Sequence, residues 1–241
     1  MYMDKYYKPG EQIQGYSITE LVGEGRYGIV YLAETYDSKK VVIKQLKPKM
    51  LNSTREKLFY EEALLKKLDS PCFPKFIQKF KHSNQEGYIL EYIKGRVFED
   101  LLAQDGHHFT KQEIYEVAFK ILDLIAILQE NNIVHRDIRL PNVIITEDNN
   151  LVLIDFGLAR YIDGKRYVKE MDYWYLGDFL IHLYYTSYYL NQYKEEHPWY
   201  EELDLTNKER LFLQKLMGLK PNYTDIEEIK RDLEELKGNI S

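Results

Sequence analysis

Two acidic motifs near the middle of the chain constrain its fold and chemistry more than any other feature. The first is His135-Arg136-Asp137, followed by Asn142, and the second, Asp155-Phe156-Gly157, begins 13 positions beyond that asparagine. An aspartate beside a hydroxyl group can orient it and accept its proton, whereas an asparagine and a second aspartate offer oxygen ligands to Mg²⁺. Two unrelated acidic turns would have to produce this order and spacing by chance. The pattern therefore indicates an acid–base centre beside a metal ion.

A glycine-rich motif lies earlier in the chain, between two expected strands. It contains Gly23, Glu24, Gly25 and Gly28. Glycine lets the backbone approach phosphate groups closely and tolerates the dihedral angles of such a turn. A dinucleotide-binding fold would need a helix after the glycines, whereas the residues after Gly28 indicate a strand. Taken alone, the motif is better explained as an ordinary glycine-rich hairpin.

A lysine at the end of an apolar strand supports a phosphate site. Lys44 follows Val41-Val42-Ile43, and a lysine in such a place needs anionic partners because its desolvation is costly. Phosphate oxygens and a carboxylate would serve. The helix expected from Thr54 offers Glu61 or Glu62, and we choose Glu61 because it shares a face with the helix leucines. Any one of these charges, taken singly, is more simply a solvated surface residue.

The periodicity predicts an α+β fold with two lobes, a small antiparallel β-sheet lobe and a larger, mainly helical lobe. We expect strands at 16–22, 28–34, 40–46, 74–82 and 87–92, a turn at 84–87, a helix from Thr54 to Leu68, helices at 111–131, 172–189, 206–217 and 224–237, and a hairpin of 142–146 with 151–154. The last helix should begin with a capping box, Thr224 with Glu227, and end at Gly238. A change of composition near 92–95 is the one boundary. We therefore expect a single domain over 1–241, with a leader (1–15), an N-lobe (16–92), a hinge (93–95) and a reduced C-lobe (96–241).

Composition excludes several classes of function. The net charge of −6 leaves no basic excess for a nucleic-acid backbone, and the single cysteine, Cys72, removes an internal disulfide and a thiolate-rich metal site. The chain shows no signal core and no apolar run long enough to span a membrane. We expect a cytoplasmic protein without nucleic-acid partners or a membrane span; the sequence leaves its oligomeric state open.

From about Tyr16 to Leu183 the motifs together resemble the eukaryotic-like (Hanks-type) protein kinase family, in a minimal, bacterial-type form. The resemblance implies a two-lobed kinase fold that uses ATP and Mg²⁺ to phosphorylate a protein substrate, with the chain itself as one candidate. The residues that it assigns to the loop covering the nucleotide are Gly23, Glu24, Gly25, Gly28 and Val30. Lys44 would bind the α- and β-phosphates with Glu61 as its ion-pair partner, Asp137 would be the catalytic aspartate, and Asn142 and Asp155 would hold the metal.

The resemblance also assigns residues around the adenine and behind the catalytic loop. Glu91 to Ile93 would form the hinge that bonds adenine through its backbone, with Leu90 as gatekeeper. Val30, Val42 and Ile144 would enclose the adenine ring. The family's apolar column would consist of Leu65, Phe76, His135 and Phe156, anchored by Asp172.

The chain departs from the family after Asp155. Only 17 positions separate Asp155 from Asp172, and they contain no Ala-Pro-Glu, serine or threonine. Activation by a phosphoserine or phosphothreonine in this interval is therefore excluded, although Tyr161 and Tyr167 could accept phosphate. We expect Arg136 to pair instead with Asp163 or Glu170, which would make the active state independent of phosphorylation.

Two further features blur the choice of acceptor. Arg139 stands where serine/threonine kinases usually carry lysine, and it could neutralise the transferred γ-phosphate. A tyrosine-rich stretch, 184–200, replaces a substrate-side helix, either as packing or as a docking surface. We expect ATP-dependent phosphorylation of a protein hydroxyl, most simply Ser/Thr. The alternatives are a small-molecule kinase of the same fold, since such relatives also lack Ala-Pro-Glu, and an ATP-binding pseudokinase or scaffold.

Overall fold

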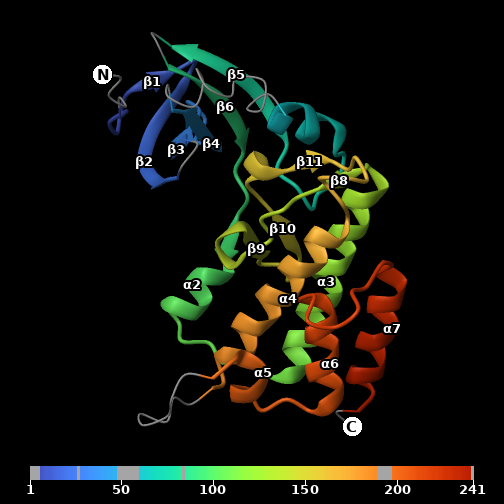
Figure 1. Cartoon of the computed structure of the whole chain (residues 1–241). Helices are drawn as coiled ribbons and strands as arrows, with labels where there is room; N and C mark the ends of the chain where they lie inside the picture. The colour runs from blue at the N-terminus through green and yellow to red at the C-terminus, as the bar shows by residue number, and fades with distance from the viewer. Residues whose placement is uncertain (1–5, 26–27, 48–59, 83–84, 189–196, 240–241) are drawn as a thin grey trace. The chain divides into compact units, whose positions relative to one another are not determined.

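The computed structural model describes residues 6–25, 28–47, 60–82, 85–188 and 197–239. The chain divides into two compact units, Met1–Lys94 and Gly95–Ser241, hereafter the N-terminal and C-terminal units (Figure 1). Each is described by itself. A small antiparallel β-sheet unit and a helical unit match the α+β class expected from the sequence.

The N-terminal unit is built on a six-stranded antiparallel sheet in the order β1-β2-β3-β4-β6-β5 (Figure 1). The strands are β1 (Gln12–Ile13), β2 (Tyr16–Glu24), β3 (Gly28–Glu34), β4 (Lys40–Leu46), β5 (Phe76–His82) and β6 (Gln85–Glu91). The turn expected at 84–87 is wrong, because β6 already begins at Gln85, which pairs with His82. Residues 60–67 are helical, and the helix start expected at Thr54 lies outside the described residues.

The stretch ahead of the first long strand contributes two residues to the core of the N-terminal unit. Tyr7 and Ile13 are buried in the same apolar cluster as Tyr31. The Tyr7 backbone N–H donates to the Tyr31 hydroxyl at 3.2 Å, and that hydroxyl donates to Gln45 at 3.3 Å. Gln45 in turn donates to Gln85 at 2.9 Å. This buried polar chain joins the N-terminal residues to β3, β4 and β6.

The two tyrosines of this chain should respond oppositely to loss of their hydroxyl groups. Within the described residues the buried Tyr7 hydroxyl has no hydrogen-bond partner. Burial is also the main reason that the pKa of Tyr7 rises to about 12. Tyr7→Phe should therefore raise the free energy of unfolding by about 1 kcal/mol, whereas Tyr31→Phe should lower it by about 1 kcal/mol. Urea unfolding measures both, and a destabilised Tyr7→Phe would contradict the arrangement.

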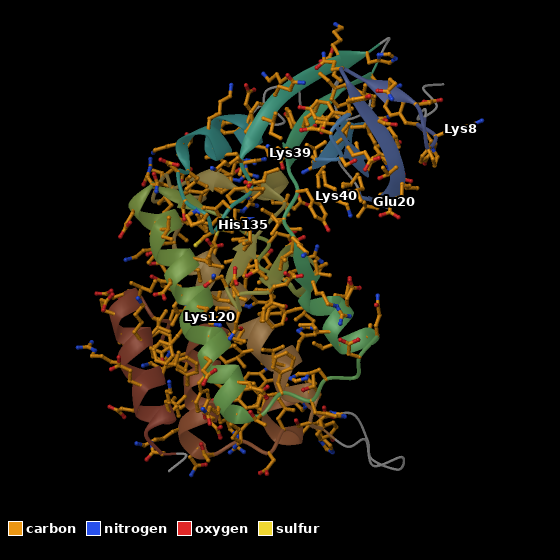
Figure 2. The ribbon with its side chains drawn as sticks, turned by 180° about the vertical axis from the view of Figure 1, so that it is seen from behind. Lys8, Glu20, Lys39, Lys40, Lys120 and His135 are labelled. Carbon is orange, nitrogen blue, oxygen red and sulfur yellow. The ribbon has the colours of Figure 1, made fainter. Side chains whose placement is uncertain are left out.

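The C-terminal unit is mainly helical and carries two small sheets, in the orders β10-β9-β7 and β11-β8. Its strands are β7 (Gly95–Val97), β8 (Ile133–Val134), β9 (Val143–Thr146), β10 (Leu151–Leu153) and β11 (Arg160–Tyr161). Its helices are α2 (Phe98–Ala103), α3 (Lys111–Glu130), α4 (Glu170–Tyr185), α5 (Trp199–Glu202), α6 (Asn207–Leu216) and α7 (Ile226–Lys237). The long helix α3 packs against α4 and α7, and α4 also packs against α6 (Figure 1). On α3, Lys120 donates to the carbonyl oxygen of Asn149 and so ties the helix to the β9–β10 turn (Figure 2).

The helix caps differ from the expected pattern. Capping boxes begin α3, where Thr110 pairs with Glu113, and α6, where Thr206 pairs with Glu209. The box expected at Thr224 is wrong: the cap of α7 is Asp225, whose side chain accepts the backbone N–H of Glu227 at 3.0 Å. An aspartate one position later satisfies the same free backbone donors. Gly238 follows α7 with φ −66°, so the helix does not end in a left-handed glycine.

Glu209 of the α6 capping box is a buried acid that joins three helices. Its carboxylate is within 2.8 Å of the Lys111 ammonium and accepts the hydroxyl groups of Tyr115 at 2.6 Å and Tyr184 at 3.3 Å. It also accepts the Thr206 backbone N–H at 2.7 Å. Tyr184 belongs to the tyrosine-rich stretch, and its contact here is one of packing inside the C-terminal unit. Residues 189–196 of that stretch lie outside the described residues.

None of the helices in the described ranges is both long enough and apolar enough to cross a membrane.

Candidate active site

The glycine motif lies at the β2–β3 turn, and its glycines serve different purposes. A Cβ added to Gly28 would lie 2.6 Å from the Gln45 carbonyl oxygen, so this glycine is required by strand packing. A Cβ on Gly23 or Gly25 would meet no described atom within 4 Å. Backbone that is open at these two positions is compatible with close approach of phosphate groups.

Lys44 and Glu61 form a buried ion pair within the N-terminal unit. The Lys44 Nζ atom lies 2.9 Å from both carboxylate oxygens of Glu61, and the two residues are 7% and 3% exposed. Glu62 points elsewhere and pairs with Lys66 at 2.7 Å and with Lys79. The choice of Glu61 over Glu62 as the partner of Lys44 is therefore confirmed as a contact.

The residues expected around adenine are divided between the two units. In the N-terminal unit, Val30 of β3 is half-buried, and Val42 of β4 stands opposite the buried Leu90 of β6. At the end of β6, the Glu91 carboxylate accepts the Lys75 backbone N–H at 3.0 Å. Ile93 is half-buried, and Ile144, buried in β9, belongs to the C-terminal unit.

Asp137 is held from two sides in the C-terminal unit. The Asn142 side-chain amide donates to both the backbone oxygen of Asp137, at 2.9 Å, and its Oδ2 atom, at 2.8 Å. The Nε atom of Arg139 lies 2.6 Å from Oδ1 of the same carboxylate. Asp137 is therefore an oriented, charge-paired carboxylate. Because Asn142 uses its NH₂ group on Asp137, its amide oxygen is the atom suited to a cation.

The backbone places Asp155 beside this loop. The Ile154 N–H donates to the Asn142 carbonyl oxygen at 2.9 Å, just before Asp155. Asp155 has a left-handed backbone with φ 62°, and its side chain accepts the Gly157 N–H at 3.2 Å. A non-glycine residue in this region is strained and is often part of a functional site. The exposed carboxylate of Asp155 and the amide oxygen of Asn142 are both oxygen donors of the kind that Mg²⁺ prefers.

Asp172 of α4 anchors the loop that leads to Asp137. Its carboxylate accepts the backbone N–H groups of His135 at 2.8 Å and Arg136 at 2.7 Å, and the residue is 1% exposed. The His135 ring meets the Phe156 ring edge-on at 4.8 Å between centroids, within the interior of the C-terminal unit. Figure 2 labels His135 among the surrounding side chains. Leu65 and Phe76, the other expected members of the apolar column, belong to the N-terminal unit.

The prediction that Arg136 pairs with Asp163 or Glu170 is wrong. The Oδ1 atom of Asp163 accepts backbone N–H groups of its own loop, from Lys165, Arg166 and Tyr167, at 2.8–2.9 Å. Glu170 makes no ion pair with Arg136 either, in the part of the chain that the structure describes. Instead, Arg136 donates to the Leu158 carbonyl oxygen at 3.1 Å, and its guanidinium lies 4.8 Å from the centre of the Tyr167 ring. No local sequence signal marks this contact, because it joins residues far apart in the chain.

Burial gives Asp172 an unusual titration. It raises the pKa of Asp172 to about 7, against the opposing effects of the hydrogen bonds from Arg136 and His135 and of the Arg136 charge. The folded state therefore holds this proton more tightly than the unfolded state does. Protonated Asp172 therefore stabilises the folded state. Its contribution to the free energy of unfolding is greatest below the ordinary pKa of 3.8 and is lost as the pH rises through about 7.

The stability of the wild type relative to Asp172→Asn should consequently fall as the pH rises from about 4 to about 7. Asparagine is neutral throughout, so the variant lacks this titration. Denaturant unfolding of both proteins at several pH values measures the difference. A difference that stays constant, or grows with pH, would show that Asp172 is ionised in the folded protein throughout this range.

Comparisons with known proteins show the family to which the chain belongs. The family model described as "Protein kinase domain" matches residues 16–189. Probable serine/threonine-protein kinase YbdM of Bacillus subtilis is 35% identical over 226 residues, which cover 90% of this chain and 88% of that protein. Serine/threonine-protein kinase C of Synechocystis sp. is 31% identical over 160 residues, covering 62% of this chain and 30% of that protein. Tyrosine-protein kinase Fer of Mus musculus is 28% identical over 151 residues, covering 63% of this chain and 18% of that protein.

The chain therefore belongs to the protein kinase family. The class of enzyme expected from the motifs, a kinase that phosphorylates proteins with ATP, is confirmed at the level of the family. This family uses a divalent metal ion together with ATP.

Proposed function

We propose that the chain transfers the γ-phosphoryl group of Mg-ATP to a serine or threonine hydroxyl of a protein substrate, and another copy of the chain is one candidate substrate. The observation that supports this most is the orientation of Asp137 by Asn142, together with the backbone hydrogen bond from Ile154, the residue before Asp155, to Asn142. Phosphoryl transfer depends mainly on positioning and charge neutralisation, which such an arrangement supplies.

Each residue has a distinct part in this proposal. Asp137 orients the acceptor hydroxyl and receives its proton, and Arg139 neutralises charge on the transferred group. The amide oxygen of Asn142 and the carboxylate of Asp155 hold Mg²⁺, which offsets the charge of the phosphates when bound. Lys44, held by Glu61, binds the α- and β-phosphates. We propose the remaining nucleotide contacts as expected from the sequence. The backbone at Gly23 and Gly25 approaches the phosphates, and Leu90, Glu91 and Ile93 face adenine.

The preference for serine and threonine rests on the relatives. Two of the three relatives above carry names of serine/threonine kinases, including the one that matches most of this chain, whereas the third is a tyrosine kinase. Arg139 does not distinguish the two acceptors. We also propose that 1–241 acts as one kinase domain with its hinge at 93–95, and that it works in the cytoplasm.

Intact-mass analysis of the purified protein after incubation with Mg-ATP tests the proposal, with Lys44→Ala and Asp155→Asn as controls. We expect added phosphate in the wild type alone, and peptide mapping should find it on serine or threonine. Phosphotyrosine would overturn the acceptor class. If a panel of generic protein substrates also remains unphosphorylated while thermal shift confirms ATP binding, a small-molecule kinase or a scaffold becomes the better interpretation. Retained partner binding in Asp155→Asn would then favour the scaffold.

A further inference from the structure

Arg136, next to Asp137, forms no ion pair with a carboxylate of the described residues. Its Nη1 atom donates to the Leu158 carbonyl oxygen, and its buried Nε atom has no hydrogen-bond partner among the described residues. Asp172 bonds the backbone N–H of Arg136. The backbone of Arg136 is left-handed, with φ 68°, so surrounding contacts must hold this residue in place.

The group that faces the guanidinium is an aromatic ring. The centre of the Tyr167 ring lies 4.8 Å from Arg136 Cζ and 5.4 Å from Arg166 Cζ. The face of an aromatic ring carries partial negative charge and attracts a guanidinium at such distances. Tyr167 is half-buried, which reduces the competition from water.

The loop that presents Tyr167 is ordered by its own backbone. Asp163 Oδ1 accepts the Tyr167 N–H at 2.8 Å, and the Asp163 N–H donates to the Tyr167 carbonyl oxygen at 3.0 Å. Just before this loop, β11 pairs with β8, and the Ile162 N–H donates to the Asn132 carbonyl oxygen at 2.9 Å. β8 leads directly into the catalytic loop. The loop is therefore ordered by its own backbone hydrogen bonds and by the Asp163 carboxylate.

We propose that Tyr167 is a positioning residue whose unmodified ring holds Arg136, and with it the catalytic loop, in the active arrangement. This inference rests on the proposed function and concerns its regulation: activity requires the ring face at position 167, and neither its hydroxyl group nor a phosphate on it. Tyr167 would then act through Arg136 without touching the substrate.

Three variants separate the ring from the hydroxyl group. Tyr167→Phe should keep kcat within about twofold of the wild type, because the ring face remains. Tyr167→Ala should lower kcat about tenfold while the KM for ATP changes little. Tyr161→Phe is the matched control, because it removes the other tyrosine hydroxyl of the same segment. Wild type treated with a phosphatase should retain its rate.

A double-mutant cycle connects the effect to Arg136. In an Arg136→Ala background, Tyr167→Ala should cause little further loss of kcat, since the ring then has no guanidinium to hold. An equal additional loss would show that the ring acts elsewhere. The proposal is also overturned by loss of activity in Tyr167→Phe, by loss of activity after phosphatase treatment, or by an unchanged kcat in Tyr167→Ala.

Hydrogen exchange makes the test independent of the proposed function. Amides in 133–142 and 158–169 should exchange faster in Tyr167→Ala than in the wild type and return to normal in Tyr167→Phe. If the wild type transfers no phosphate to any substrate tried, the proposed function fails and this comparison still decides the role of the ring. Unchanged exchange in Tyr167→Ala would refute it.

Discussion

Replacing Asp137 with asparagine is expected to lower kcat for phosphoryl transfer by about 10²–10⁴-fold, the usual contribution of a positioned acid–base group. Asparagine has the same shape and can still accept the hydrogen bond from Asn142, now at 2.8 Å to Asp137 Oδ2, so the loop should keep its backbone. It cannot take up the proton of the acceptor hydroxyl, and it leaves Arg139 without its charged partner. Initial rates with saturating Mg-ATP measure the effect.

Asp148→Asn provides the matched control, because Asp148 is an exposed carboxylate in the β9–β10 turn of the same unit. Its rate should equal that of the wild type. Thermal shift should show that Asp137→Asn still binds ATP, since the nucleotide contacts are other residues. Equal rates in Asp137→Asn and Asp148→Asn would remove Asp137 from the chemistry and with it the main support for the proposed mechanism.

Glu209→Ala is expected to produce the largest loss of stability, about 3–5 kcal/mol in the free energy of unfolding. The carboxylate is 2% exposed and receives hydrogen bonds from Lys111, Tyr115, Tyr184 and the Thr206 backbone. Burial raises the pKa of Glu209, but the hydrogen bonds from Lys111, Tyr115 and Thr206 outweigh it and hold the pKa below its ordinary value. Alanine would leave all these donors without their acceptor. Urea unfolding at neutral pH measures the loss.

The exposed pair of Lys208 and Glu235, 3.6 Å apart, supplies the comparison. Glu235→Ala should cost no more than about 1 kcal/mol, as is usual for surface ion pairs. Because folding lowers the pKa of Glu209, its contribution should be present at neutral pH and lost as the pH falls through the folded-state pKa. If Glu209→Ala unfolds as readily as Glu235→Ala, the three helices are held together by apolar packing alone.

The parts of the structure that could be predicted from the sequence are those with a local physical cause. Strand periodicity and turn residues predicted β3 and β4 with the boundaries that the structure has. The helical spacing of Glu61 with the leucines selected it over Glu62, since only one of two neighbouring helix positions can face the sheet. The motifs around Asp137 and Asp155 predicted the protein kinase family because their order and spacing are specific to it.

The parts that could not be predicted depend on side chains brought together by the fold. The partner of Arg136 was expected among nearby acids, but the Asp163 carboxylate is used by three backbone N–H groups of its own loop. The Tyr167 ring lies against the Arg136 guanidinium where a carboxylate was expected. A search of the sequence for opposite charges does not consider aromatic residues as partners. Thr206 and Glu209 have the spacing of a capping box, yet this spacing gives no indication that Tyr115 and Tyr184 converge on the same carboxylate.

The described residues before residue 16, where the family match begins, are part of the folded N-terminal unit. The match begins at residue 16, but Tyr7 lies in the core of the sheet, and the Tyr6 hydroxyl donates to Glu24 of the glycine motif at 2.8 Å. Glu24 is also paired with Lys47 from the end of β4. A segment outside the family match thus contacts the glycine motif directly, through Glu24. Under the proposed function, we expect substitutions at Tyr6 or Tyr7 to change the affinity for ATP even though the family motifs stay intact.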